Sequence, residues 1–211
     1  MSSTDLFWDV DTQVDFMHPD GRLYVPGSVE IIPVLGRLTD WAHARGIRIV
    51  ASADDHVPGH RELSDTPDGI TTFPEHCMRG TPGQRKIPET TLRDPLVIDP
   101  APQAVPDLTA RVRAHDGDIL FLKHWFDVFT NPNVLPVVDA LAPGRIVLYG
   151  VALDVCNRYA IEGFLAHRPG IPVALVTDAT RAIDASRAEG LLADWTARGV
   201  TLTTADEVMR G

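Results

Sequence analysis

The stretch that decides the fold is Arg145-Ile-Val-Leu-Tyr-Gly-Val151, followed directly by Ala152-Leu-Asp-Val-Cys156. The first seven residues predict a buried β-strand, because short apolar runs that end in a turn are typical of strands covered on both faces. The pattern from Asn157 to His167 predicts a helix. Cys156 is therefore expected at a helix start, where unpaired backbone N–H groups and the helix dipole favour the thiolate. The thiolate is the form of cysteine that attacks carbon.

Strands and helices alternate along the rest of the chain. The predicted strands are Leu6–Val10, Ile47–Ala53, Ile119–Lys123, Ile146–Val151, Val173–Thr177 and Val200–Thr203. The predicted helices are Val29–Arg45, Val134–Leu141, Asn157–His167 and Ala185–Arg198. This alternation favours one α/β domain over residues 1–211, Rossmann-like, with three α/β/α layers around a mainly parallel six-stranded sheet. Residues 54–118 break the rhythm and are rich in proline, so we expect a loop-rich, irregular insertion there.

Composition excludes several classes of protein. The chain has 211 residues and a net charge of −10 without a Lys/Arg cluster, which argues against a nucleic-acid partner. No apolar run approaches the ~18 residues of a membrane span, so no membrane association is expected. The Met1–Asp5 segment lacks the basic start of a signal peptide. Cys77 and Cys156 are too few for a disulfide framework, and a cytoplasmic location is expected.

Chemically active side chains follow several predicted strands at the points where those strands end. Asp11 follows the first strand, Lys123 ends the third, and Cys156 lies in the turn after the fourth. In open α/β sheets, sites form at the carboxyl ends of the strands. These three residues are therefore expected to form the catalytic group, with the ammonium stabilising both the thiolate and the carboxylate.

A second group of side chains has the composition of a metal site. Asp54 and His56 end the second predicted strand, and His76 follows after a loop. One carboxylate and two imidazoles favour zinc, with manganese or iron as alternatives, so one divalent ion is the expected cofactor. His60 is either a fourth ligand or a loop histidine, and the sequence leaves both open.

These motifs resemble the isochorismatase-like cysteine hydrolase superfamily, in particular its nicotinamidase/pyrazinamidase branch, from about Leu6 to Val208. Asp11-Thr-Gln-Val-Asp-Phe16 is similar to the opening motif D-x-Q-x-D-F, and Gly150-Val-Ala-Leu-Asp-Val-Cys156 to the nucleophile motif G-V-A-x-D-x-C. Lys123 stands in the place of the family lysine. The segments around Asp54-x-His56 and Phe73-Pro-Glu-His-Cys77 are similar to the nicotinamidase metal site.

The resemblance implies a metal-dependent cysteine amidohydrolase that cleaves a small carboxamide, in the first place nicotinamide, through a thioester. It implies a cis peptide before Ala152, and an oxyanion hole formed by the N–H groups of Ala152 and Cys156. The metal would either orient the substrate ring or supply the hydrolytic water. A small amide is the expected partner, and a homodimer or homotetramer the expected assembly. The residues expected to bind substrate are Gln13, Phe16, Phe73, Phe126 and Val151.

Two departures from the branch leave other activities open. Phe73 stands where nicotinamidases usually carry tryptophan, and His124–Asn131 replaces a Y-S-x-F stretch. A second hypothesis is therefore a related hydrolase for a ureido, carbamoyl or cyclic amide. A third is a metal- or ligand-binding protein without catalysis, which the intact set of Asp11, Lys123 and Cys156 disfavours.

Overall fold

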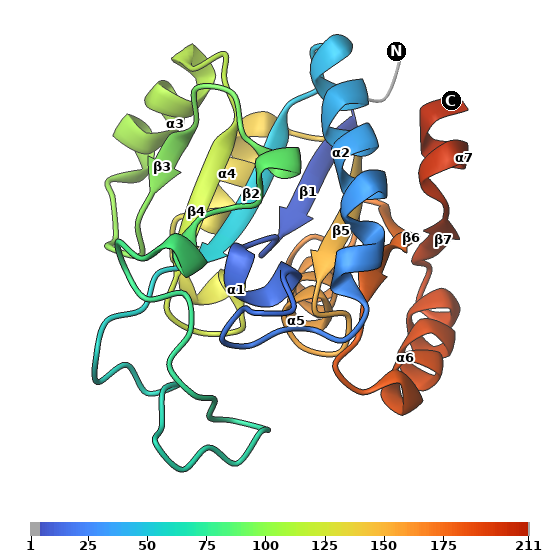
Figure 1. The fold of residues 1–211 in the computed structure, drawn as a ribbon. Helices are drawn as coiled ribbons and strands as arrows, with labels where there is room; N and C mark the ends of the chain where they lie inside the picture. Colours follow the sequence, from blue (N-terminus) through green and yellow to red (C-terminus); the bar gives the residue numbers. More distant parts are fainter. Residues whose placement is uncertain (1–4, 211) are drawn as a thin grey trace.

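The computed structural model of the protein describes residues 5–210 and shows a parallel β-sheet between two layers of helices (Figure 1). Residues 1–4 and 211 lie outside the described residues. They include both ends of the predicted domain 1–211 and most of the Met1–Asp5 segment. The strand order is β3-β4-β2-β1-β5-β6-β7, and every neighbouring pair is parallel. The α/β/α architecture predicted from the sequence is thus confirmed.

The strands match the prediction closely in position. They are β1 (Asp5–Val10), β2 (Ile49–Asp54), β3 (Leu96–Ile98), β4 (Ile119–Lys123), β5 (Arg145–Val151), β6 (Val173–Arg181) and β7 (Thr201–Thr203). Within residues 5–210 the sheet has seven strands, so the prediction of six was wrong. The missed strand is β3, a three-residue edge strand that is too short to show a hydrophobic period.

The α-helices are α1 (Val14–Met17), α2 (Ser28–Ala44), α3 (Val105–Ala114), α4 (Val134–Leu141), α5 (Cys156–His167), α6 (Ala185–Ala197) and α7 (Ala205–Arg210). Three short 3₁₀ turns are η1 (Pro82–Gln84), η2 (Pro88–Thr90) and η3 (Val128–Thr130). None of the helices within residues 5–210 combines the length and apolar character needed to cross a bilayer.

The irregular part of the chain is shorter than the expected 54–118, because β3 and α3 both lie within that range. The prolines near position 100 suggested a loop, but Pro106 lies in the first turn of α3, where proline is tolerated. Strand β6 also runs four residues beyond the predicted end at Thr177. Asp178 therefore lies inside β6, where its carboxylate accepts a hydrogen bond from the Ala205 N–H at the start of α7.

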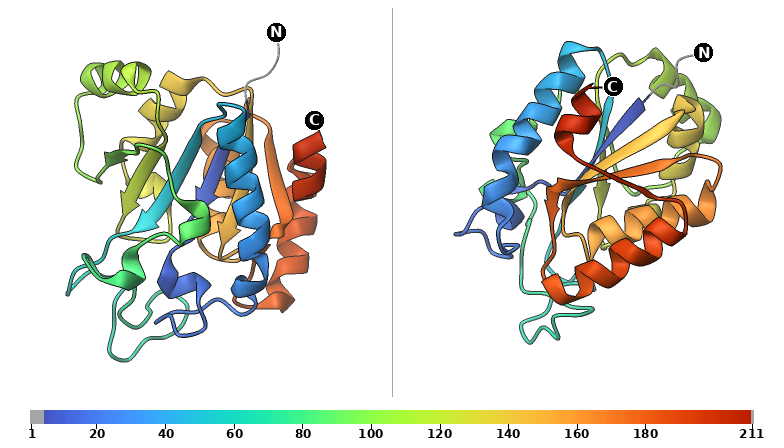
Figure 2. Two further views of the ribbon diagram at one scale, coloured as in Figure 1. Left: turned by 45° about the horizontal axis from the view of Figure 1, so that its top comes forward. Right: turned by 90° about the vertical axis from the view of Figure 1, so that its right-hand side faces the viewer.

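Two hydrophobic clusters, one on each face of the sheet, hold the layers together. Leu6, Trp8 and Val10 of β1 pack into the cluster formed with α3, α4, α5 and α6, while Phe7 packs toward α2 and α7. Figure 2 shows these two helical layers on opposite sides of the strands. Burial on both faces explains why the strands read as continuous apolar runs rather than as alternating ones.

The chain starts in the middle of the sheet, adds β2, β3 and β4 on one side, and then crosses over to β5 on the other side of β1. The carboxyl ends of the parallel strands lie at one edge, the lower edge in Figure 1. The crevice between β1 and β5 is therefore the topological switch point, where open α/β sheets place their ligands. The segments after these two strands carry Asp11 and Cys156.

Candidate active site

The structure brings Asp11, Lys123 and Cys156 together at this switch point. The Lys123 Nζ lies 2.9 Å from Asp11 Oδ2 and 3.7 Å from Cys156 Sγ, and it donates a hydrogen bond to Asp54 Oδ1 at 2.5 Å. Both the ammonium and the Asp11 carboxylate are buried. The thiol thus lies next to one cation and one carboxylate, as nucleophilic catalysis by cysteine requires.

Burial, more than the helix start, governs the charge on Cys156. Desolvation raises the pKa of the thiol well above its ordinary value, against the opposing effect of Lys123, and a hydrogen bond to Asp11 raises the pKa further. Burial therefore works against the thiolate that the helix start was expected to favour. The thiol lies beside a carboxylate that can take its proton.

Asp11 is held ready for that role by its surroundings. Its residue adopts a φ of +49°, a left-handed conformation that aspartate tolerates better than most residues. The Ser52 hydroxyl on the neighbouring strand donates a hydrogen bond of 2.6 Å to Asp11 Oδ1. Burial raises the pKa of Asp11, while Lys123 and Ser52 act to lower it. Ser52 was missed by the sequence analysis, since a serine inside a buried strand carries no motif.

The backbone between β5 and α5 offers two hydrogen-bond donors beside the thiol. The Val151–Ala152 peptide bond is cis. Within residues 5–210, neither the Ala152 N–H nor the Cys156 N–H donates a hydrogen bond to another group. The strand before this turn passes so close to β1 that a Cβ on Gly150 would lie 2.1 Å from the Val10 carbonyl oxygen. Only glycine fits this position of the nucleophile motif.

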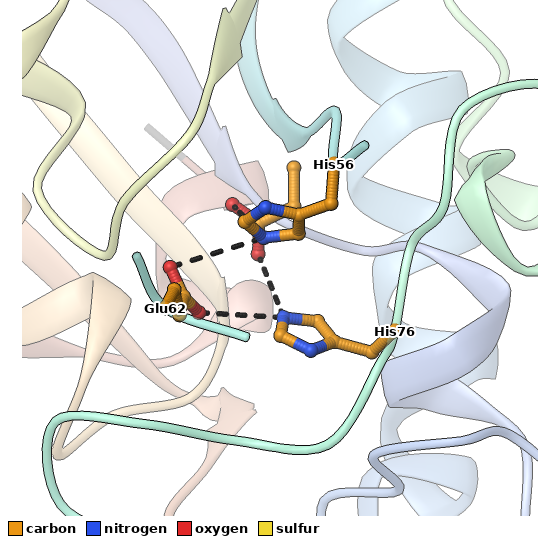
Figure 3. Close-up of side chains that lie close together, drawn as sticks. His56, Glu62 and His76 are labelled. Atoms are coloured by element: carbon orange, nitrogen blue, oxygen red, sulfur yellow. Dashed lines mark ion pairs between the residues drawn. The ribbon is translucent and has the colours of Figure 1, made fainter. Parts of the chain in front are cut away.

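Four buried side chains converge next to the thiol, and Figure 3 shows three of them pointing at one another. They are Asp54, His56, Glu62 and His76, and one ligand atom from each lies within 4.8 Å of the others. The His76 Nε2 lies 3.3 Å from Glu62 Oε1 and 3.6 Å from Asp54 Oδ2. The His56 Nε2 lies 3.8 Å from Glu62 Oε2 and 3.9 Å from Asp54 Oδ1.

This group fits a divalent cation. Ligands placed at 2.0–2.1 Å around a tetrahedral ion are roughly 3.3–3.4 Å apart, close to the separations found here. Three of the converging atoms, His56 Nε2, Glu62 Oε2 and His76 Nε2, are buried without a hydrogen-bond partner. The His76 Nδ1 lies 2.8 Å from the Pro74 carbonyl oxygen, so that Nδ1 carries the proton and Nε2 is left as a ligand.

The electrostatics of the group also favour a cation at this position. Burial opposes the charged form of His76, but the Asp54 and Glu62 carboxylates that face its Nε2 outweigh this effect and raise its pKa to about 10. Burial lowers the pKa of His56 to about 4. The two carboxylates therefore favour a positive charge between them, which a metal cation would supply.

The fourth member of the group is Glu62 and not His60, which the sequence left open as a ligand. The His60 Nδ1 lies 3.3 Å from His56 Nδ1, on the side of that ring away from the cluster. His60 therefore contacts a member of the group and is not itself one of the four. Glu62 was missed because the loop 57–75 carries no periodic pattern, and only its path in space brings this carboxylate inward.

A pocket opens onto the thiol, and most of its walls are apolar. Of the residues expected to bind substrate, Phe16, Phe73, Phe126 and Val151 line it. The remaining lining residues are Leu23, Val25, Asp54, Glu62, Ala152, Val155, Cys156 and Ile183.

Gln13, which was expected to bind substrate, does not line the pocket. Its amide nitrogen donates to the carbonyl oxygens of Asp54 and Gln84, and its amide oxygen accepts from the Asp54 N–H. A side chain with both ends occupied by backbone groups has little capacity left for a ligand. Gln13 instead fixes the end of β2, and with it the position of Asp54.

Comparisons with known proteins agree with this geometry. The family model of the isochorismatase domain matches residues 9–207. The chain is 27% identical to a nicotinamidase of Escherichia coli K12, with 92% of each chain covered. It is 28% identical to a nicotinamidase/pyrazinamidase of Mycobacterium tuberculosis H37Rv, over 92% of this chain and 95% of the relative. The crystal structure of a Pyrococcus horikoshii pyrazinamidase in complex with zinc is similar, with a TM-score of 0.75, 24% identity, and 95% and 99% of the two chains covered.

Proposed function

The chain belongs to the isochorismatase family, and from this premise we propose that it is a metal-dependent cysteine amidohydrolase for a neutral aromatic carboxamide. It is a hydrolase that acts on amide carbon–nitrogen bonds. Nicotinamide, cleaved to nicotinate and ammonia, is the substrate we propose. The nicotinamidase relatives and the chemistry of the pocket both support it.

The observation that carries the substrate class is the absence of any Lys, Arg or His among the described residues that line the pocket. The charged groups in the lining are the carboxylates of Asp54 and Glu62. A substrate that carries its own carboxylate would find no Lys, Arg or His side chain in the lining to pair with it. This disfavours ureido and carbamoyl acids, whereas a flat neutral ring is suited to the walls formed by Phe16, Phe73 and Phe126.

In the first half of the proposed reaction, Asp11 takes the proton of the Cys156 thiol. The Lys123 ammonium, 3.7 Å from the sulfur, stabilises the thiolate as it forms. The sulfur attacks the carbonyl carbon of the amide, and the free N–H groups of Ala152 and Cys156 donate hydrogen bonds to the resulting oxyanion. Asp11 then gives its proton to the amine, so that ammonia leaves and a thioester on Cys156 remains.

In the second half, Asp11 acts again as the base. It removes a proton from a water molecule that attacks the thioester carbonyl, and the same two N–H groups stabilise the second oxyanion. The thiolate leaves and recovers the proton from Asp11, which restores the resting site.

Asp54, His56, Glu62 and His76 would hold the metal ion, and zinc fits this ligand set best. When bound, the ion supplies a Lewis acid for the ring nitrogen of the substrate. In support of this role, Asp54 and Glu62 line the same pocket as the aromatic walls and Cys156.

The test is ammonia release from nicotinamide by zinc-loaded protein, with Cys156→Ala as the blank. Benzamide, which lacks the ring nitrogen, and N-carbamoylglycine, which carries a carboxylate, are the comparison substrates. We expect the highest kcat/KM for nicotinamide, a lower value for benzamide, and no turnover of the carbamoyl acid. Preferred turnover of the carbamoyl acid, or nicotinamide cleavage that persists in Cys156→Ala, would overturn the proposal.

A further inference from the structure

Two short segments at the mouth of the pocket pack against each other residue by residue. The His60 and His124 rings have centroids 4.3 Å apart. The Arg61 guanidinium carbon lies 3.8 Å from the centre of the Trp125 ring. The next residues along the two segments, Glu62 and Phe126, both line the pocket.

Each segment therefore ends in a residue of the site. The first comes from the loop after β2 and ends in Glu62, a member of the metal-ligand group. The second follows directly after Lys123, the last residue of β4, and ends in the aromatic wall at Phe126. The Phe126 ring in turn has the Trp125 ring at 4.3 Å, the Phe73 ring at 5.6 Å and the Tyr159 ring at 6.0 Å.

Of the two contacts, the one between Arg61 and Trp125 lies directly next to the pocket residues Glu62 and Phe126. Among the ion pairs and hydrogen bonds of residues 5–210, none involves the Arg61 side chain, so the stack on Trp125 is the directed contact that orients it. A guanidinium at this distance from an indole ring is attracted to the negative face of the ring. The stack also removes freedom from a loop whose carboxylate, at the adjacent residue, must point inward.

We propose that Arg61 and Trp125 are positioning residues that couple the metal site to the aromatic wall of the pocket. The stack fixes Glu62 in the orientation in which it joins Asp54 and the two histidines, and it fixes Phe126 against the substrate ring. Metal binding, which draws on Glu62, tightens the stack, and through it sets the position of Phe126. This inference rests on the proposed function for its effect on substrate, but its effect on metal binding does not.

The chain contains its own matched control. Arg45 stacks on Trp41 with its guanidinium carbon 4.3 Å from the ring centre, and this pair lies on and directly after α2, outside the pocket. Arg61→Met and Arg45→Met each remove one arginine–tryptophan stack and one charge while keeping an unbranched side chain. A loss that follows only from general stability or net charge would be the same in both variants.

The first experiment is zinc affinity, measured by competition with a chromophoric chelator on purified metal-free protein. We expect Arg61→Met to bind zinc about tenfold more weakly than the parent, the lower end of the effect of residues that orient metal ligands. Arg45→Met is expected to bind as the parent does, and Arg61→Lys, which keeps the cation, to recover part of the loss. Equal affinities in the parent and in Arg61→Met would overturn the proposal.

The second experiment reads Trp125 directly. The parent is expected to change its fluorescence on zinc binding, and the change should be absent both in Trp125→Phe and in Arg61→Met. With zinc saturating, Arg61→Met is expected to raise the KM for nicotinamide severalfold and to leave kcat within about twofold, since Phe126 contacts the ring rather than the reacting atoms. A fall in kcat at unchanged KM would contradict a positioning role.

The two proposals fail in different ways. If zinc affinity depends on Arg61 but no amide is cleaved, the coupling stands and the proposed activity is wrong. If nicotinamide is cleaved and Arg61→Met matches the parent in zinc affinity and in KM, the activity stands and the coupling is wrong.

Discussion

Replacement of Ser52 by alanine tests the account of Asp11 as the proton acceptor. Ser52 is buried, and its hydroxyl donates a hydrogen bond of 2.6 Å to Asp11 Oδ1. Alanine removes this donor without opening a large cavity. The ionised carboxylate then loses one of the three groups that lower its pKa, the others being Lys123 and Cys156. The variant should therefore hold Asp11 in its protonated form over a wider range of pH.

The size of the effect follows from the type of bond. A hydrogen bond to a charged group contributes about 1.5–3 kcal/mol, and one pKa unit corresponds to about 1.4 kcal/mol. The pKa of Asp11 is already raised by burial, so ionised Asp11 lowers the stability of the fold as pH rises above the unfolded value of 3.8. The loss of stability in Ser52→Ala should thus be about 1.5–3 kcal/mol at pH 7 and smaller near pH 4, where Asp11 is protonated in both proteins.

The assay is the pH profile of kcat/KM for nicotinamide with zinc saturating, together with urea unfolding at pH 4 and pH 7. We expect the acidic limb of the profile to move up by about one pH unit or more, since that limb reports the base of the free enzyme. Ser28→Ala is the control, because Ser28 is equally buried but donates to the carbonyl oxygens of Phe16 and Met17. An acidic limb that stays where the parent has it would refute Asp11 as the base.

Three further outcomes follow from the site. Cys156→Ala should abolish turnover and keep the melting temperature within a few degrees of the parent. In the parent, the rate at which iodoacetamide labels Cys156 should still increase above pH 9, because burial raises the thiol pKa. A labelling rate that levels off below pH 8 would contradict this. Glu62→Gln should weaken zinc binding at least tenfold in the chelator competition, and an unchanged affinity would remove Glu62 from the ligand group. Gln13→Leu should lower the free energy of unfolding by about 2–4 kcal/mol in urea, because it leaves backbone groups of Asp54 and Gln84 unpaired, whereas a cost under 0.5 kcal/mol would contradict the role given to this amide.

The local pattern of the chain was sufficient for most of the fold. The apolar runs of β1, β2, β4 and β5 were predicted to within two residues, because strands buried on both faces leave a continuous signal in the sequence. The short edge strand β3 and the polar helix α3 left no such signal, since neither buries a full apolar face. The prolines in and next to α3 were interpreted as loop residues, because proline in a first helical turn and proline in a loop look alike in sequence.

The residues of the candidate site also differ in how well the local sequence pattern predicts them. Asp11, Lys123 and Cys156 could be placed together from sequence because each follows or ends a strand of one parallel sheet, whose topology brings carboxyl ends to a common edge. Side chains held by loops, or whose role depends on a partner, could not be assigned in this way. Glu62 and Gln13 are the two examples: one turned out to join the metal-ligand group, and the other to hold the backbone that supports it.

The sequence by itself determined the order of six strands and four helices, the edge at which they place chemistry, and the grouping of Cys156 with Asp11 and Lys123. Only the tertiary structure decided the burial that raises the pKa of the Cys156 thiol, the fourth member of the metal-ligand group and the apolar character of the pocket around them. The physical reason is that periodicity is written in neighbouring residues, whereas desolvation, charge pairing and ligand convergence depend on groups that are far apart in the chain and meet only when it folds.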